Sequence, residues 1–174
     1  MNKLINMRYI LAVIIGMLTI QSSNAQEKQW ALGFLTDIQF KDSSPYASYG
    51  LQGRYDLDNH QSMQAQVYGR GEFIGVGADY LIQFLNKEKS NFNVFLGLGL
   101  SQEFFTYESA VEDEQASPMK IKENFTKAIG QIGVSQYFPT VGLSIYGGFK
   151  TKYQFKNEHM DANYLTLGLR YHIW

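Results

Sequence analysis

Apolar and polar residues alternate along almost the whole chain after residue 28. Near the carboxyl end, Leu165, Leu167, Leu169, Tyr171 and Ile173 occupy every second position, and polar or small residues lie between them. A period of two places the two sets of side chains on opposite faces of a β-strand. The pattern predicts an all-β protein with eight antiparallel strands. The alternating segments cover about 30–40, 47–57, 62–70, 74–84, 92–103, 127–138, 141–155 and 165–173.

The lengths of these segments point to a membrane. Most have about 10 to 14 residues, whereas soluble strands typically have ~5–6 and a tilted strand crosses a bilayer with ~9–11. The compact connections at 58–61, 86–91 and 139–140 alternate with connections at 41–46, 71–72, 105–124 and 156–162. Except for the tight link at 71–72, we expect longer loops at one end and short turns at the other, which is typical of transmembrane barrels.

The polar face indicates which side of the sheet turns inward. A soluble secreted barrel would point its apolar face inward, whereas a membrane barrel turns that face to lipid. Here the polar face is rich in Gly, Ser, Gln and single charges of both signs, which suits the crowded interior of a narrow barrel. We expect Tyr68 to join a polar network there. The charged residues assigned to this lumen are Asp37, Arg54, Asp56, Arg70, Asp79, Glu103, Lys127, Lys150 and Arg170.

Aromatic residues on the apolar face cluster near the strand ends, with aliphatic residues between them. Two aromatic girdles around an aliphatic band are typical of proteins whose strands cross a bilayer. The sequence therefore predicts a closed, up-and-down transmembrane β-barrel. The residues assigned to the membrane interfaces are Trp30, Phe40, Tyr49, Tyr55, Phe84, Phe92, Phe138, Phe149, Tyr153 and Tyr171.

The first 25 residues do not follow this pattern. Lys3 and Arg8 accompany a short apolar run at 9–20, and the small residues SNA at 23–25 match a cleavage site. These features predict a secretory signal peptide at 1–25 and a mature barrel at 26–174. The alternative, a retained membrane helix, would need ~20 apolar residues. Without this segment the chain has 13 basic and 16 acidic residues. This small negative net charge argues against nucleic acid as a partner.

A cleaved signal, eight amphipathic strands and the ending LTLGLRYHIW resemble the small outer-membrane β-barrels of Gram-negative bacteria, of the OmpA transmembrane domain, OmpX and OmpW types. The resemblance covers the whole mature chain and is one of pattern. It implies contact with outer-membrane lipid and recognition of the last strand by the barrel assembly machinery. Trp174 departs from the family pattern, because it lies one position out of phase with the apolar set that ends at Ile173.

Candidate chemistry is sparse. The family includes lipid-modifying enzymes, and His159 with Asp161 and Ser43 or Ser44 would be the residues for such a site near the outer rim. We interpret His159 as a solvated loop residue and expect no enzymatic activity and no cofactor. Glu108 and the acidic residues at 112–114 could bind a divalent cation, but they lack the spacing and turn glycine of a calcium loop. We therefore expect no metal site.

These observations predict a monomeric outer-membrane barrel with a closed polar lumen. Its expected role is structural or contact-making, through the extracellular loops and above all through 105–124. The alternatives are a narrow conduit for small hydrophobic solutes, a lipid-modifying enzyme and a soluble barrel. A hydrophobic conduit needs an apolar lumen. The apolar residues on the lumen face are only Leu35, Leu81, Phe95 and Ile129.

Overall fold

The computed structural model describes residues 29–41, 44–71, 73–109, 119–156 and 158–173. The predicted signal peptide and Trp174 lie outside these residues. Within them, no helix has the length and apolar character needed to span a bilayer. The strands are β1 (Trp30–Lys41), β2 (Ser44–Asp56), β3 (Gln61–Arg70), β4 (Phe73–Gln83), β5 (Phe92–Ser109), β6 (Met119–Phe138), β7 (Leu143–Gln154) and β8 (His159–His172).

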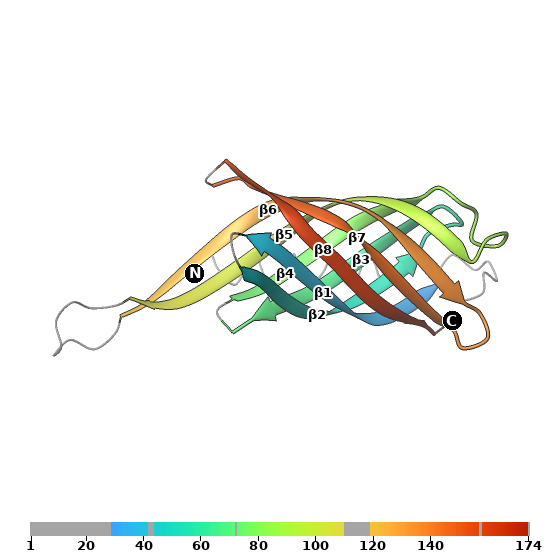
Figure 1. Ribbon diagram of the computed structural model, residues 1–174, viewed down its shortest axis with the longest axis horizontal. Coiled ribbons are helices and arrows are strands. Elements are labelled where there is room, and N and C mark those ends of the chain that lie inside the picture. The colour runs from blue at the N-terminus through green and yellow to red at the C-terminus, as the bar shows by residue number, and fades with distance from the viewer. Residues whose placement is uncertain (1–28, 42–43, 72, 110–118, 157, 174) are drawn as a thin grey trace, which may run out of the picture.

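The eight strands form one closed antiparallel barrel in chain order (Figure 1). β1 pairs with β2 on one edge and with β8 on the other, and Leu32 lies opposite both Gly53 and Tyr171. The last strand therefore closes the sheet, and no strand edge is left inside the barrel wall to expose unpaired backbone groups. The predicted fold is confirmed.

The two faces of the barrel wall differ sharply in exposure. Phe34, Leu98 and Phe149 on the outer face are each 67% exposed, whereas Asp37 and Arg170 on the inner face are each 1% exposed. In β7 nearly every second residue is buried from end to end. The apolar set of the sequence therefore faces outward and the polar set faces the barrel axis, which is the arrangement of a membrane barrel.

Glycines on the inner face make room for large lumen side chains. A Cβ at Gly75 would lie 2.6 Å from Cζ of Tyr68 on the neighbouring strand, and a Cβ at Gly168 would overlap the ring of Tyr146. Both rings are buried. These glycines explain why the inner face of a narrow barrel can hold aromatic and long charged side chains together.

The predicted lengths of the outer connections are wrong. Pairing between β1 and β2 extends as far as Lys41 and Ser44, and pairing between β7 and β8 extends as far as Gln154 and His159. The β1–β2 and β7–β8 links are therefore tight. The predicted loop at 105–124 is largely strand, because β5 and β6 pair up to Ser109 and Met119. Only residues 110–118 of that segment lie outside both the strands and the described part of the chain.

The extension of β5 and β6 has a physical explanation. β4 stops pairing with β5 at Phe73 and Phe105, and β7 stops pairing with β6 at Gln154 and Lys127. The residues beyond, 106–109 and 119–126, form a two-stranded β5–β6 ribbon past the rest of the barrel, at the end opposite the C-terminus (Figure 1). Water can reach both faces there, and a charged residue, Glu123, interrupts the alternation of Met119, Ile121 and Phe125 with the polar residues between them.

Candidate functional site

A buried ion pair between β1 and β7 lies in the lumen. The ammonium of Lys150 donates to both carboxylate oxygens of Asp37, at 2.8 and 2.9 Å. Both side chains are almost completely inaccessible to solvent. Lys152, two residues further along β7, lies 4.0 Å from the same carboxylate. The alternation of β7 brings both lysines to the inner face, where Asp37 partly neutralises them.

Glu103 of β5 continues this network across the barrel. Its carboxylate accepts from Lys152 at 2.9 Å and from Lys127 of β6 at 2.7 Å. The Tyr68 hydroxyl of β3 donates to the same carboxylate at 2.9 Å. The ammonium of Lys152 also lies 4.3 Å from the centroid of the Tyr68 ring and 4.8 Å from that of Tyr164. Side chains from β1, β3, β5, β6, β7 and β8 thus meet in one buried cluster.

A second group of buried charges is held through glutamines. Arg170 donates to the side-chain oxygen of Gln64 at 2.7 Å, and its guanidinium carbon lies 3.7 Å from the centroid of the Tyr146 ring. Gln64 and Gln66 donate to one oxygen of Asp79, at 3.4 and 3.0 Å. In the described part of the chain Asp79 has no ion pair. The lumen charges are therefore held partly by ion pairs and partly by hydrogen bonds.

An apolar layer lies below these networks. Leu81, Phe95 and Tyr146 form a buried cluster, and the Phe95 and Tyr146 rings meet edge to face at 6.2 Å. Each residue lies two positions along its strand from a residue that lines a cavity at the barrel end; these cavity residues are Gln83, Asn93 and Ser144. The layer therefore separates the cavity from the charged network.

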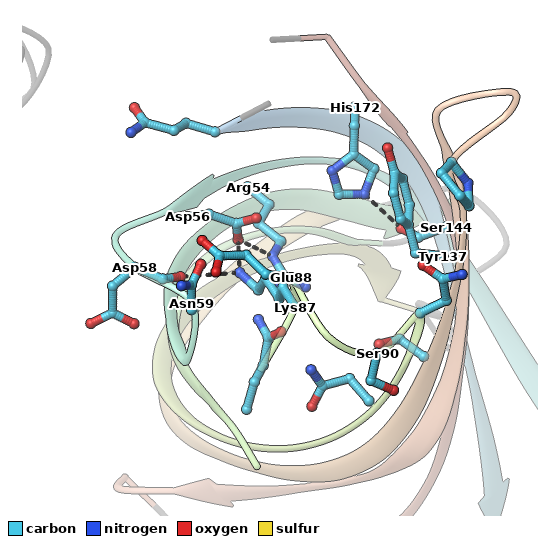
Figure 2. Close-up of a pocket in the computed structure, with 16 residues that line it drawn as sticks. Arg54, Asp56, Asp58, Asn59, Lys87, Glu88, Ser90, Tyr137, Ser144 and His172 are labelled. Atoms are coloured by element: carbon cyan, nitrogen blue, oxygen red, sulfur yellow. Dashed lines mark hydrogen bonds and ion pairs between the residues drawn. The ribbon is translucent and has the colours of Figure 1, made fainter. Parts of the chain in front are cut away.

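The cavity, which we call the vestibule, has a volume of about 750 Å³ and lies at the end where the two terminal strands begin and end. Figure 2 shows two clusters around it. Asp56 accepts from Arg54 at 2.8 Å and from Lys87 at 2.7 Å on one side. His172 and Ser144 are hydrogen-bonded at 3.0 Å on the other side. The Tyr137 ring packs against the His172 ring with centroids 4.8 Å apart.

The connection between β4 and β5 brings Lys87 to the vestibule. The Asn86 side chain accepts from the Glu88 backbone, and the Asn86 carbonyl accepts from the backbones of Lys89 and Ser90, which fixes a tight turn. Burial, together with the nearby Arg54 guanidinium, lowers the pKa of Lys87 to about 8, although the Asp56 carboxylate acts in the opposite direction. The Lys87 ammonium is therefore less readily protonated than that of an exposed lysine.

The family model of the Helicobacter outer membrane proteins matches residues 1–172. The chain belongs to this family. No curated protein is significantly similar to it in sequence. The N-terminal β-barrel domain of Pseudomonas aeruginosa OprF is similar in structure, with 14% identity, a TM-score of 0.60, and coverage of 83% of this chain and 98% of that one. Neisserial surface protein A has 13% identity and a TM-score of 0.55 over 83% and 96% of the two chains. These two likenesses concern the fold.

As a member of the Helicobacter outer membrane protein family, the protein is located in the outer membrane. Barrels of that membrane have short periplasmic turns and longer extracellular connections. The longest connection, at 110–118, follows the β5–β6 ribbon, and both terminal strands end on the opposite side of the barrel. By this rule we expect the ribbon at the cell exterior and the vestibule open toward the periplasm.

The aromatic residues assigned to the membrane interfaces lie on the outer face. Tyr55 is half-buried and the other nine are exposed, with Tyr49 and Phe149 among the most exposed side chains of the barrel. An outward orientation is what a residue needs in order to contact lipid headgroups. Their depth in the bilayer stays a prediction.

Most of the charged residues assigned to the lumen lie inside the barrel wall, but Arg70 does not. Arg70 has the inward phase of Tyr68, yet it is the last residue of β3, and its exposed guanidinium lies 4.7 Å from the centroid of the Tyr46 ring. Arg70 therefore lies at the rim, where the wall ends, rather than in the buried network. Asp56 is half-buried at the vestibule. The seven others are buried: Asp37, Arg54, Asp79, Glu103, Lys127, Lys150 and Arg170.

Of the remaining sequence candidates, the structure describes the side chains of His159 and Asp161. His159 is exposed, and its Nε2 lies 3.3 Å from Asp161. Ser43 lies outside the described residues, as do the acidic residues at 112–114. Among the residues that the structure describes, no group of three His, Asp or Glu side chains is arranged to hold a metal.

Sequence reasoning missed the role of Lys152, although its position on the polar face of β7 was a usable signal.

Proposed function

We propose that this outer-membrane barrel acts through its surfaces, as a single chain with a blocked lumen, rather than as a pore or an enzyme. The observation that carries this proposal is the buried cluster formed by Asp37, Lys150, Lys152, Glu103 and Lys127. It joins four strands through side chains that are shielded from water. An eight-stranded barrel leaves an interior just wide enough to be filled in this way.

Planar bilayers test the blocked lumen. The purified barrel is expected to give no stepwise conductance, because an ion would have to displace the pair of Lys150 and Asp37, which are held at 2.8 Å. A detergent blank and a known porin in the same bilayers give the baseline and the positive signal. Reproducible conductance steps that depend on Lys150 would contradict the proposal and favour the narrow conduit.

The β5–β6 ribbon supports a contact-making role. Thr106 and Lys122 pair across it, beyond the last residues that pair with β4 and β7. Tyr107 is 41% exposed, and the side chains of Lys120 and Lys122 are exposed as well. An extended strand pair with outer edges that no neighbouring strand covers can contact another molecule through backbone and side chains. The described part of the chain contains no comparable projection.

A trimmed barrel tests this role. Replacing residues 106–122 with a two-residue turn is expected to leave barrel folding intact, because the removed pairs lie outside the wall and the Phe105–Glu123 pair remains. Adhesion of whole cells to protein-coated surfaces is then expected to fall relative to cells with the full chain. Heat-modifiable gel migration verifies folding, and Lys89→Met, at the opposite end, is the control. Equal adhesion by the trimmed and full-length barrels would contradict the contact role.

The lipid-modifying alternative has one feature in its favour, the hydrogen bond between Ser144 and His172. A serine nucleophile needs a histidine that is itself oriented by a third group. The nearby carboxylate of Asp56 is bound to Arg54 and Lys87, and in the described part of the chain no carboxylate is hydrogen-bonded to His172. We therefore interpret the pair as part of the vestibule wall.

A further inference from the structure

The vestibule is a preformed polar cavity that ends blindly at the layer of Leu81, Phe95 and Tyr146. Its volume of about 750 Å³ falls within the ~300–1,000 Å³ that is common for small-molecule sites. It lies at the opposite end from the β5–β6 ribbon, so its role is independent of the contact function proposed above.

Positive charge is in excess on the inner part of the charged wall. Arg54 and Lys87 both donate to one carboxylate oxygen of Asp56, so two cations share a single anion. Burial is the main cause of the lowered pKa of Lys87, and the like charge of Arg54 adds to it. The Lys87 ammonium also donates to the Asp58 carbonyl at 3.5 Å. A carboxylate entering the cavity could replace this long contact with a charge-assisted hydrogen bond.

Negative charge is in excess at the rim. Glu88 lines the cavity next to Lys87, is exposed, and its carboxylate makes no hydrogen bond or ion pair with another described residue. Asp58 also lines the cavity, and one of its oxygens caps the turn through the backbone N–H groups of His60 and Gln61. The rim can therefore attract a cationic group while the interior attracts an anionic one.

The rest of the lining suits a peptide backbone. The side chains of Asn59 and Asn91 line the cavity and can both donate and accept hydrogen bonds. On the opposite wall, Tyr137 packs against His172 and presents an aromatic surface beside the polar groups (Figure 2). Planar amide groups pack well on such a surface, and their N–H and C=O groups need polar partners.

We propose that the vestibule binds a short zwitterionic peptide from the periplasmic side. The peptide's terminal carboxylate contacts Lys87 beside Arg54, and its terminal ammonium contacts Glu88 at the rim. This arrangement places each end of the ligand next to the opposite charge.

Binding of trialanine to the full barrel in lipid nanodiscs tests the proposal by titration calorimetry. Trialanine is expected to bind saturably. Trialanine amide and N-acetyl-trialanine each lack one terminal charge and are expected to bind about tenfold more weakly, since a hydrogen bond to a charged group is lost. Lys87→Met is expected to weaken trialanine binding by a similar factor and to leave the affinity for the amide almost unchanged. Glu88→Gln is expected to weaken trialanine binding by a similar factor and to leave the affinity for N-acetyl-trialanine almost unchanged.

Lys89→Met is the matched control, because Lys89 is an exposed lysine in the same connection that does not line the cavity. It is expected to bind trialanine as the wild type does. Heat-modifiable migration checks that each variant is folded; Lys87→Met leaves Asp56 paired with Arg54. Absence of saturable binding, equal affinity for trialanine and its blocked forms, or wild-type binding by Lys87→Met would overturn the proposal. Equally strong binding of inorganic phosphate would also overturn it, by indicating a simple anion site.

Discussion

Lys150→Met is expected to destabilise the barrel by about 3–5 kcal/mol, because removing one partner of a buried ion pair leaves the other charge uncompensated. Asp37, the charge left behind, is 1% exposed and receives both of its short ion-pair contacts from Lys150. Lys152 is 4.0 Å away and is already bound to Glu103 at 2.9 Å, so it can replace Lys150 only in part. Urea unfolding in lipid vesicles, followed by tryptophan fluorescence, measures the loss.

A double variant separates the ion pair from simple packing. Asp37→Asn combined with Lys150→Met removes both charges, and its stability is expected to lie closer to wild type than that of Lys150→Met alone. Lys122→Met, on the exposed β5–β6 ribbon, is expected to change stability by less than about 0.5 kcal/mol. If Lys150→Met were no more destabilising than Lys122→Met, the buried pair would not contribute to holding the barrel closed.

The barrel wall could be predicted from the sequence because lipid and lumen impose opposite chemistry on successive residues. In β7, Ile145 and Phe149 face lipid and are apolar, whereas Lys150 and Lys152 face the lumen and are charged. Apolar and polar residues therefore alternate along the whole strand. Where water reaches both faces of a strand pair, alternate residues no longer have to differ in polarity. On the ribbon Glu123 takes a position in the apolar phase, and the strand residues at 106–109 and 119–124 were predicted as part of a loop, although they pair regularly.

Contacts between distant residues were harder to predict than the direction in which a side chain points. The phase of Arg70 was predicted correctly, but only the structure reveals that Arg70 lies at the rim, with its guanidinium over the Tyr46 ring. Lys87 lies in a polar turn that looks solvated in sequence, yet the turn at Asn86 brings its ammonium to Asp56. The vestibule depends on such contacts, and alternation alone gives no signal for them.

Leu96→Arg is expected to cost about 2–4 kcal/mol, since an arginine on the lipid face within the aliphatic band loses hydration. Leu96 is 40% exposed on the outer face of β5, and its cross-strand partners Ile82 and Ile132 are exposed apolar residues as well. If water rather than lipid surrounded this outer face, the substitution would have little effect on stability. The free energy of unfolding in vesicles therefore tests which solvent surrounds this face.

Thr106→Arg provides the matched comparison, because Thr106 is on the same strand with the same outward phase but lies on the ribbon beyond the wall. The cost of a lipid-facing arginine falls to about 0–1 kcal/mol near the interface, so Thr106→Arg is expected to be nearly neutral. A large difference between the two variants would place the bilayer around Leu96 and leave the ribbon in water. Equal stability would instead mean that the apolar face at Leu96 does not contact hydrocarbon, and both the outward orientation of the wall and the external position of the ribbon would have to be reassigned.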